Sequence, residues 1–395
     1  MNDGARIEVA QVVTRFIAGA GGVALRGAME LDPGTYHVTV VTGARSALLD
    51  QAEAAGMDTV VEPSLVAPIA PRSDATALAR LTALFRARAF DVVHTHSAKA
   101  GALGRLAAHR AGVPLVAHTY HGFPFHDFQD PVRHAAYVGI ERRLARITDE
   151  VFAIGTGVAT EALRRGLARP DALHRIAPAV AVSPVVRTAD TRARARVLLG
   201  LDPDVPVVGT VGRIEFQKAP EHFVAAVAAL ARRDTHAVWV GSGPDARQTE
   251  ELVRARGLAH RVHLVGERTD VDLLLPAFDV FAMASRYEGL PCAVVEAMHC
   301  GLPVVATAVN SVSDLVVPGE TGLLVPPGRP ELLARAIDCL LADPARADRL
   351  AARGQALAAE GYDVAGLAGV LDAVYRRGLH RRLVASGGRH DVAIP

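Results

Sequence analysis

Two glutamates flank the start of an expected helix: Glu288 stands just before it and Glu296 follows eight positions later. Gly289, Leu290 and Pro291 form a turn after a short apolar run, and proline is favoured in the first turn of a helix. The backbone N–H groups and the dipole of such a helix end attract a phosphate or diphosphate. Eight helical residues span about 12 Å on roughly one face. That separation suits a ligand with a sugar at one end of a diphosphate and a ribose at the other. The alternative is that Glu296 caps or salt-bridges a surface helix.

A second polar group follows an expected strand at 207–211, where Gly212 and Arg213 come first and Lys218 ends the loop. Of the 43 basic residues only Lys99 and Lys218 are lysine, and both follow expected strands. Ligands of open α/β sheets bind at such strand ends. A diphosphate that leaves during bond cleavage gains charge, so cations here would stabilise the transition state more than the ground state. The alternative is that Arg213 and Lys218 are ordinary surface cations.

Several histidines also follow expected strands. His121 opens the segment His-Gly-Phe-Pro-Phe, where an imidazole could contact a hydroxyl or support an oxocarbenium-like centre. His94 and His96, together with His118 and His126, raise the alternative of a metal site. Their spacings follow strand alternation and lack a helical His-x-x-x-His pair, so no metal ligand set is predicted. A satisfied polar core is a further interpretation of some of these side chains.

The run Gly-Ala-Gly-Gly-Val-Ala at 19–24 matches the dinucleotide pattern G-x-G-x-x-G/A. Five residues separate it from the preceding strand, and the second expected strand is not followed by the acidic residue that would hold a ribose hydroxyl. We therefore interpret the run as a flexible loop in which Gly21 and Gly22 approach a phosphate or sugar, rather than as an NAD site.

Short β-branched runs alternate with amphipathic stretches along the chain, which is typical of parallel sheets covered by helices. The expected strands of the first half are 7–13, 36–42, 92–95, 114–118 and 150–154, and its expected helices are 74–88, 98–111 and 131–146. The second half repeats the pattern, with expected strands at 207–211, 237–240, 261–265, 280–284, 303–307 and 322–325 and helices at 220–232, 245–256, 289–300, 330–342 and 345–359. The sequence predicts an α/β fold of two Rossmann-like domains that face a central cleft.

The length of 395 residues suits two domains better than one core. We expect an N-terminal domain over 1–180, a linker over 181–205 and a C-terminal domain over 206–364. The linker contains prolines and an arginine-rich stretch at 187–196, and it would include a short helix. A helix at 365–377 and a tail would complete the chain over 365–395.

Composition excludes several classes of protein. Half of the residues are apolar and 22% are charged, which argues against disorder. The formal net charge of +1 gives no field for nucleic acid. No apolar run reaches the roughly 18 residues of a membrane span, and the first four residues are unlike a signal peptide. Three cysteines argue against a disulfide framework. A cytoplasmic protein is expected.

The segment from Glu288 to Thr307 resembles the retaining glycosyltransferases of the GT-B fold, family 4, and the resemblance runs over nearly the whole chain. Glu288 and Glu296 meet the family's E-x7-E motif. The Gly-Arg…Gln-Lys motif of the family is met by Gly212, Arg213, Gln217 and Lys218. Other matching segments are 321–328 in the second half, and 19–24, 94–101 and 121–125, which are similar to the acceptor domain of polysaccharide-building members.

This resemblance implies roles for the residues. Arg213 and Lys218 would neutralise the donor diphosphate, Glu296 would bind the ribose and Glu288 the transferred sugar. The remaining donor-side residues would be Gly21, Gly22, Gly212, Gly289, Leu290 and Pro291. His96, Lys99 and His121 would lie on the acceptor side, with His121 also catalytic. The family needs no divalent metal, so no cofactor is expected. Retention would proceed by front-face attack, with the leaving phosphate accepting the acceptor's proton.

One loop departs from the family pattern. Many relatives have Gly-Gly-x-Pro-Glu where this chain reads Val-Asn-Ser-Val-Ser-Asp at 309–314. Asp314 would stand in for the glutamate, and the change bears on donor choice.

The leading hypothesis is transfer of a sugar, with retention, from a UDP- or GDP-linked donor to a carbohydrate or lipid-linked acceptor. The alternatives are a nucleotide-sugar epimerase on the same fold and a non-catalytic partner subunit that binds a nucleotide sugar. A further hypothesis is peripheral contact with the inner face of the membrane, through the basic side chains Arg142, Arg143, Arg146, Arg164 and Arg165. Its alternative is a solvated helix face with Glu141 and Asp149 nearby.

Overall fold

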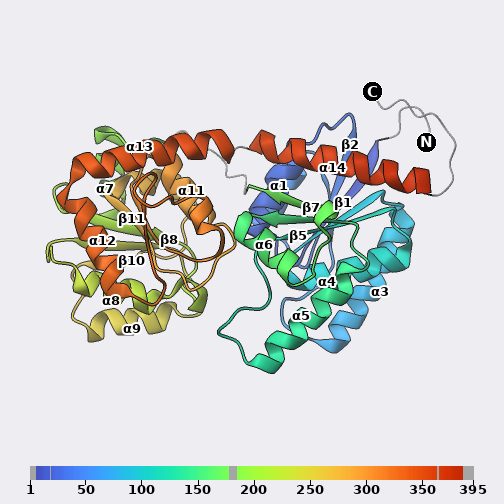
Figure 1. Ribbon diagram of the computed structural model, residues 1–395, viewed down its shortest axis with the longest axis horizontal. Helices are drawn as coiled ribbons and strands as arrows, with labels where there is room; N and C mark the ends of the chain where they lie inside the picture. Colours follow the sequence, from blue (N-terminus) through green and yellow to red (C-terminus); the bar gives the residue numbers. More distant parts are fainter. Residues whose placement is uncertain (1–5, 18, 178–184, 363, 386–395) are drawn as a thin grey trace. The chain divides into compact units, whose positions relative to one another are not determined.

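The computed structural model describes residues 6–17, 19–177, 185–362 and 364–385 (Figure 1). The chain divides into two compact units. The first unit comprises Met1–Ala179 and Val364–Pro395, and the second comprises Val180–Asp363. Each unit holds a parallel sheet with helices packed against it, so the expected α/β class with two Rossmann-like halves is confirmed.

The first unit has a seven-stranded sheet in the order β3-β2-β1-β4-β5-β6-β7. Its strands are β1 (Ile7–Val13), β2 (Tyr36–Thr42), β3 (Asp58–Val61), β4 (Val92–His96), β5 (Leu115–Tyr120), β6 (Glu150–Ile154) and β7 (Leu173–Ile176). The strand order reverses between β1 and β4, which makes their carboxyl ends the switch point where open α/β sheets bind ligands. At this place Gln11 pairs in register with His94, and Val13 with His96.

The helices of the first unit include one that comes from the far end of the sequence. They are α1 (Ala20–Met29), α2 (Ala47–Ala54), α3 (Pro71–Arg88), α4 (Ala98–Ala111), α5 (Pro131–Ala145), α6 (Thr156–Arg164), η1 (Pro170–Ala172) and α14 (Val364–Ala385). A Cβ on Gly27 of α1 would lie 3.0 Å from Leu367 of α14, and one on Gly378 would lie 2.6 Å from Leu115 of β5. Glycine therefore lets α14 pack closely against α1 and β5.

The second unit has a six-stranded sheet in the order β10-β9-β8-β11-β12-β13. Its strands are β8 (Val207–Val211), β9 (His236–Val240), β10 (Val262–Leu264), β11 (Val280–Met283), β12 (Val304–Thr307) and β13 (Leu323–Val325). Its helices are α7 (Ala189–Leu199), η2 (Phe216–Lys218), α8 (Pro220–Ala229), α9 (Ala246–Ala255), α10 (Val271–Leu274), η3 (Leu275–Ala277), α11 (Cys292–His299), η4 (Asn310–Asp314), α12 (Pro330–Ala342) and α13 (Pro344–Gly361).

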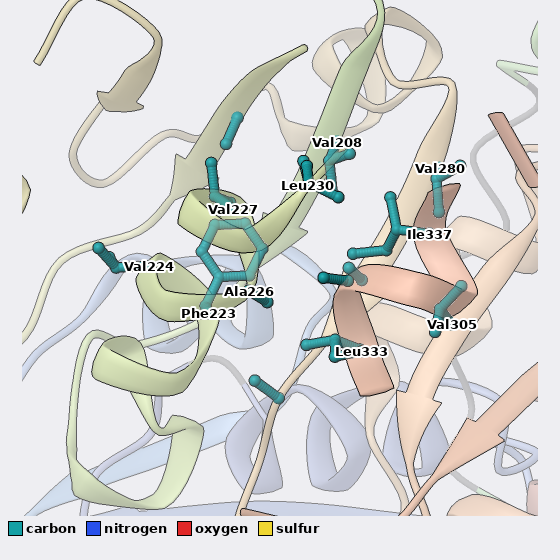
Figure 2. Packing of buried hydrophobic residues seen from close by; sticks show 14 of the residues in the cluster. Val208, Phe223, Val224, Ala226, Val227, Leu230, Val280, Val305, Leu333 and Ile337 are labelled. Atoms are coloured by element: carbon teal, nitrogen blue, oxygen red, sulfur yellow. The ribbon is translucent and has the colours of Figure 1, made fainter. Parts of the chain in front are cut away.

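The core of the second unit lies between its sheet and helices α8 and α12. Figure 2 shows Phe223 and Val227 of α8 in the same cluster as Val208 of the sheet and Leu333 of α12. The Phe223 ring also meets the Trp239 ring edge to face, with centroids 5.2 Å apart. This apolar layer holds β8 and its neighbours, so that the loops at their carboxyl ends have a rigid base.

Within the expected linker over 181–205, of which 181–184 lie outside the described residues, the arginine-rich part forms helix α7. Helix α7 belongs to the second unit, where the buried Arg196 donates to Asp279 over 2.8 Å and to four backbone carbonyls, among them that of Ala277. The C-terminal helix is also longer than expected and belongs to the first unit. None of the helices in the described ranges combines the length and apolar character of a membrane span.

Candidate functional site

The lysine and the first glutamate of the expected diphosphate site meet at the carboxyl edge of the second sheet. Strands β8 and β11 are neighbours, and Lys218 follows the first while Glu288 follows the second. The Lys218 Nζ lies 2.6 Å from Glu288 Oε1. Only 5% of the Glu288 side chain is exposed, so a full charge is held here with little water around it. Such a charge is stable only when it is paired and hydrogen-bonded.

Two further side chains hold the same carboxylate. Ser285 Oγ donates to Glu288 Oε1 over 2.6 Å, and Gln217 Nε2 donates to Oε2 over 3.0 Å. Ser285 comes just after β11, and no sequence signal marked it beyond its place in the loop. With Lys218, these donors fix the orientation of Glu288.

The loop that departs from the family pattern also contacts Glu288. It forms η4, and Asn310 at its start has a left-handed φ of 44°, which asparagine tolerates better than most residues. The Asn310 Oδ1 accepts a hydrogen bond from the Glu288 backbone N–H over 2.9 Å. Asp314 lies half-buried at the other end of η4.

The glycines after β8 and β9 allow two loops to touch. Gly212 has a φ of 151°, and a Cβ on Gly241 would lie 2.1 Å from the Gly212 carbonyl oxygen. A Cβ on Gly243 would lie 2.3 Å from the Ile214 carbonyl oxygen. Only glycine fits at these two positions, so the backbone of this edge is fixed by close packing. The pattern Gly-Ser-Gly after an expected strand was a signal for this loop that the sequence reasoning did not use.

Arg213 occupies the same edge but is more exposed. Its side chain is 56% exposed, and its Nη2 lies 2.7 Å from Glu215 Oε2. Burial raises the pKa of Glu215, while the charges of Arg213 and Lys218 act in the opposite direction. Glu215 therefore lies close enough to both cations to feel their charge, and sequence reasoning missed it.

Helix α11 is shorter than the sequence predicts. It begins at Cys292 with Pro291 as its N-cap, and Gly289 and Leu290 lie in the preceding turn. Because Glu288 lies four residues before the helix, the rise of a helix does not measure its separation from Glu296, and that geometric argument was wrong. Glu296 lies one turn into α11, half-buried between the buried residues Val295 and Ala297.

The two histidines of the expected acceptor side lie together in the first unit. His96 ends β4, His121 follows the end of β5, and His96 Nδ1 lies 2.9 Å from His121 Nε2. Burial lowers the pKa of His121 to about 3 and that of His96 well below its usual value. Both imidazoles are therefore neutral near pH 7, and each offers one donor and one acceptor.

Lys99 has a different partner. Its Nζ lies 2.6 and 2.7 Å from the two carboxylate oxygens of Asp74, an ion pair between α4 and α3. The structure shows no hydrogen bond between Lys99 and either histidine of the expected acceptor side within its described ranges.

The expected flexible glycine loop is a helix in the structure. Gly21 and Gly22 lie buried in the first turn of α1, and Gly19 before it has a φ of 75°. A Cβ on Gly21 would lie 3.0 Å from the Phe16 backbone carbon, so the small residue serves close packing. The loop interpretation was wrong because a glycine-rich run fits both a mobile loop and a tightly packed helix start.

Hydroxyl groups partner other buried histidines of the first unit. His118 Nδ1 lies 2.8 Å from Thr95 Oγ1, and His94 Nε2 lies 2.7 Å from Thr119 Oγ1. Across the described ranges, no three side chains of His, Cys, Asp or Glu are grouped as metal ligands.

Comparisons with known proteins place this geometry in a family. The model of the glycosyl transferase 4-like domain matches residues 18–179, and that of the glycosyl transferases group 1 matches residues 192–357. The chain is 32% identical over 302 residues to the alpha-D-kanosaminyltransferase of Streptomyces kanamyceticus. This alignment covers 72% of this chain and 76% of the relative. It is 31% identical over 271 residues to the UDP-Gal:alpha-D-GlcNAc-diphosphoundecaprenol alpha-1,3-galactosyltransferase of Escherichia coli, with coverages of 67% and 69%.

A solved structure shares the fold. The Anabaena protein HepE, in complex with UDP and glucose, aligns with a TM-score of 0.82 at 21% identity, over 94% of this chain and all of HepE. The chain therefore belongs to the GT-B glycosyltransferases, with a glycosyl transferase 4-like domain followed by a group 1 domain.

Proposed function

We propose that this glycosyltransferase moves a sugar from a UDP- or GDP-linked donor to a hydroxyl of a carbohydrate or lipid-linked acceptor, with retention at the anomeric carbon. The observation that carries the proposal is the buried contact between Lys218 and Glu288 at the carboxyl edge of the second sheet. The names of similar proteins support it: the E. coli relative takes UDP-Gal and a diphosphoundecaprenol-linked acceptor, and HepE was solved with UDP and glucose.

The second unit would bind the donor. A diphosphate would offer Lys218 an acceptor with more charge than Glu288 carries, and Arg213 is exposed enough to turn from Glu215 toward the same phosphates. Ser285 and Gln217 would continue to donate to Glu288, whose carboxylate would then accept hydrogen bonds from sugar hydroxyls.

The proposed transfer breaks the bond between the anomeric carbon and the diphosphate oxygen. The acceptor oxygen forms the new bond on the same face, and its proton passes to the leaving phosphate. Lys218 and Arg213 would stabilise the charge that develops on the diphosphate, so the proposal requires no metal ion. Glu296 would accept hydrogen bonds from the ribose hydroxyls.

A panel of UDP- and GDP-sugars tests the function, with nucleotide release measured in the presence of candidate acceptors. We expect release from one donor that continues in EDTA, and an NMR spectrum of the product with the anomeric configuration of the donor. An inverted product would overturn retention. A donor that changes into its epimer without acceptor would favour the epimerase, and no turnover by the purified chain would favour the non-catalytic partner.

We also propose contact between helix α5 and an anionic membrane at the cytoplasmic face. Arg142, Arg143 and Arg146 at its end are exposed, whereas Glu141 is buried and its Oε2 lies 2.7 Å from Arg105 Nη2. The second acidic neighbour of the alternative interpretation, Asp149, pairs with Arg382. Neither carboxylate therefore pairs with the arginines at the end of α5. Arg164 and Arg165 contribute less, because both pair with Glu161.

Liposome flotation tests the membrane contact. We expect binding to vesicles with anionic lipid that is lost at high salt, and weaker binding by Arg142→Ser/Arg143→Ser than by the control Arg247→Ser on α9. Equal flotation of both variants would reject the role of α5.

A further inference from the structure

A continuous chain of hydrogen bonds runs through the interior of the first unit from helix α14 to His121. The Tyr375 hydroxyl lies 2.5 Å from His94 Nδ1 and 3.2 Å from Gln11 Nε2. Gln11 Oε1 lies 2.7 Å from His96 Nε2, and His96 Nδ1 lies 2.9 Å from His121 Nε2. The chain joins residues 364 positions apart, and its first four members are buried.

The Tyr375 hydroxyl sets the direction of this chain, since it has one proton and two neighbours. A phenol is a stronger acid than a neutral imidazole N–H, and an imidazole nitrogen is a stronger base than a phenol oxygen. The short contact is therefore a hydrogen bond from the Tyr375 O–H to His94 Nδ1. His94 then carries its proton on Nε2 and donates it to Thr119 Oγ1.

The position of the Tyr375 proton fixes the donors and acceptors in the rest of the chain. Because the proton of Tyr375 is engaged with His94, its oxygen accepts from the Gln11 amide N–H, and Gln11 Oε1 faces His96. His96 must then be protonated on Nε2, which leaves a lone pair on its Nδ1. That lone pair accepts from His121 Nε2–H, so the remaining ring nitrogen of His121, Nδ1, carries no proton.

Two observations support a neutral chain that ends in an acceptor. Burial lowers the pKa of His94 and His121 to about 3, and that of His96 well below its usual value. His121 follows the carboxyl end of β5 and is partly exposed, and in the described part of the chain no residue bonds to its Nδ1.

We propose that Tyr375 is a positioning residue which, through Gln11 and His96, holds His121 in the tautomer whose Nδ1 accepts a hydrogen bond from a substrate hydroxyl. The substrate part of this statement rests on the proposed function; the tautomer part rests on the hydrogen bonds alone. The C-terminal helix would thus affect the reaction through a single buried hydroxyl.

NMR of protein labelled with 15N-histidine tests the tautomer without any substrate. Long-range 1H–15N correlations distinguish protonated from unprotonated ring nitrogens, and His121→Gln assigns the signal of His121. We expect a protonated Nε2 and an unprotonated Nδ1 near pH 7. A protonated Nδ1 would mean that the chain runs in the opposite direction and would overturn the proposal.

Tyr375→Phe tests the origin of the chain, and Tyr36→Phe is its matched control. Tyr36 also links a sheet strand to α14, because its hydroxyl donates to Asp372 over 2.8 Å, but in the described ranges it forms no hydrogen bond with the histidines. We expect Tyr375→Phe to convert the His121 signal into a mixture of tautomers and Tyr36→Phe to leave it unchanged. Gln11→Met interrupts the same chain from β1 and should repeat the effect should Tyr375→Phe not fold.

Steady-state kinetics test whether the tautomer of His121 affects turnover. With a donor identified by the nucleotide-sugar panel, we expect kcat/KM to fall about tenfold in Tyr375→Phe and Gln11→Met, while the Kd of the nucleotide stays within twofold. An unchanged tautomer or an unchanged kcat/KM in both variants would overturn the proposal. If no donor is turned over while the tautomers behave as expected, the proposed function fails and the positioning of His121 by Tyr375 stands.

Discussion

The carboxyl edges of the two sheets carry different polar chemistry on similar frameworks. In the first unit, neutral imidazoles, an amide and hydroxyls bond to one another around His96 and His121. In the second unit, Lys218, Glu288 and Arg213 place full charges at the edge. Neutral groups that donate and accept suit the hydroxyls of a sugar, whereas cations suit a diphosphate. Under the proposed function, the side chains at the strand ends, rather than the fold, would determine which half binds the diphosphate and which binds sugar hydroxyls.

The two edges also differ in the free energy of their burial. A neutral network costs little to bury when every donor and acceptor has a partner. A buried carboxylate depends on its cation, and removal of one partner leaves a charge without compensation. Changes at the second edge should therefore affect both activity and stability, and changes at the first edge should act mainly through protonation.

The largest expected effect is that of Lys218→Ala. We expect a loss of 10²-fold or more in kcat, because the developing charge of the diphosphate loses its cation. We also expect a loss of about 3 kcal/mol in the free energy of unfolding, because Glu288 stays buried without Lys218. Steady-state kinetics and urea unfolding measure the two effects.

A second variant separates these two effects. Lys218→Ala/Glu288→Gln removes the buried charge, so it should recover most of the lost stability and none of the activity. Recovery of activity in the double variant would show that Lys218 acts only by neutralising Glu288.

The pH dependence of stability also distinguishes the two units, and in the first unit His118 contributes to it. Burial holds the pKa of His118 well below its usual value, so below about pH 6.5 the unfolded chain takes up a proton that the folded chain does not. Stability should therefore fall as the pH falls, by about 2 kcal/mol for this histidine between pH 8 and pH 5. In His118→Asn, urea unfolding at the two pH values should show a loss smaller by that amount.

The matching variant in the second unit is His263→Asn. His263 is half-buried, and burial lowers its pKa from the usual value. We expect a smaller change in the acid loss of stability than for His118. An equal change in both variants would remove this difference between the units.

The smallest expected effect is that of Glu296→Ala. Half-buried on α11, Glu296 should contribute to ribose binding and little to stability, so calorimetry should show about a tenfold weaker Kd for the nucleotide with a free energy of unfolding within 1 kcal/mol. Glu250→Ala on α9 is the exposed control. The same affinity in wild type and Glu296→Ala would reject the ribose contact.

The sequence predicted the described strands of the second sheet and the inner strands of the first, but neither edge strand of the first sheet. Strands β1, β2, β6 and β8 begin and end where expected, because each is a short run rich in β-branched and apolar residues. The edge strands β3 and β7 were missed, since β3 is half-exposed and β7 carries His174 and Arg175 among its four residues.

Site residues could be predicted from the sequence where they belong to a recognised motif. Lys218 and Glu288 were expected at one ligand, and the structure brings them into contact. Asn310 was not predicted as a contact, because its role depends on a left-handed backbone that the sequence does not show. Gln11 and Tyr375 were not predicted either, since only the packing of α14 brings the two ends of the chain together.

Calorimetric titration of UDP and GDP into wild type and Lys218→Ala tests the central claim most directly. We expect wild type to bind one of the two nucleotides at a single site, and Lys218→Ala to bind it at least tenfold more weakly. Equal affinity of the two proteins, or no binding of either nucleotide by wild type, would contradict the account.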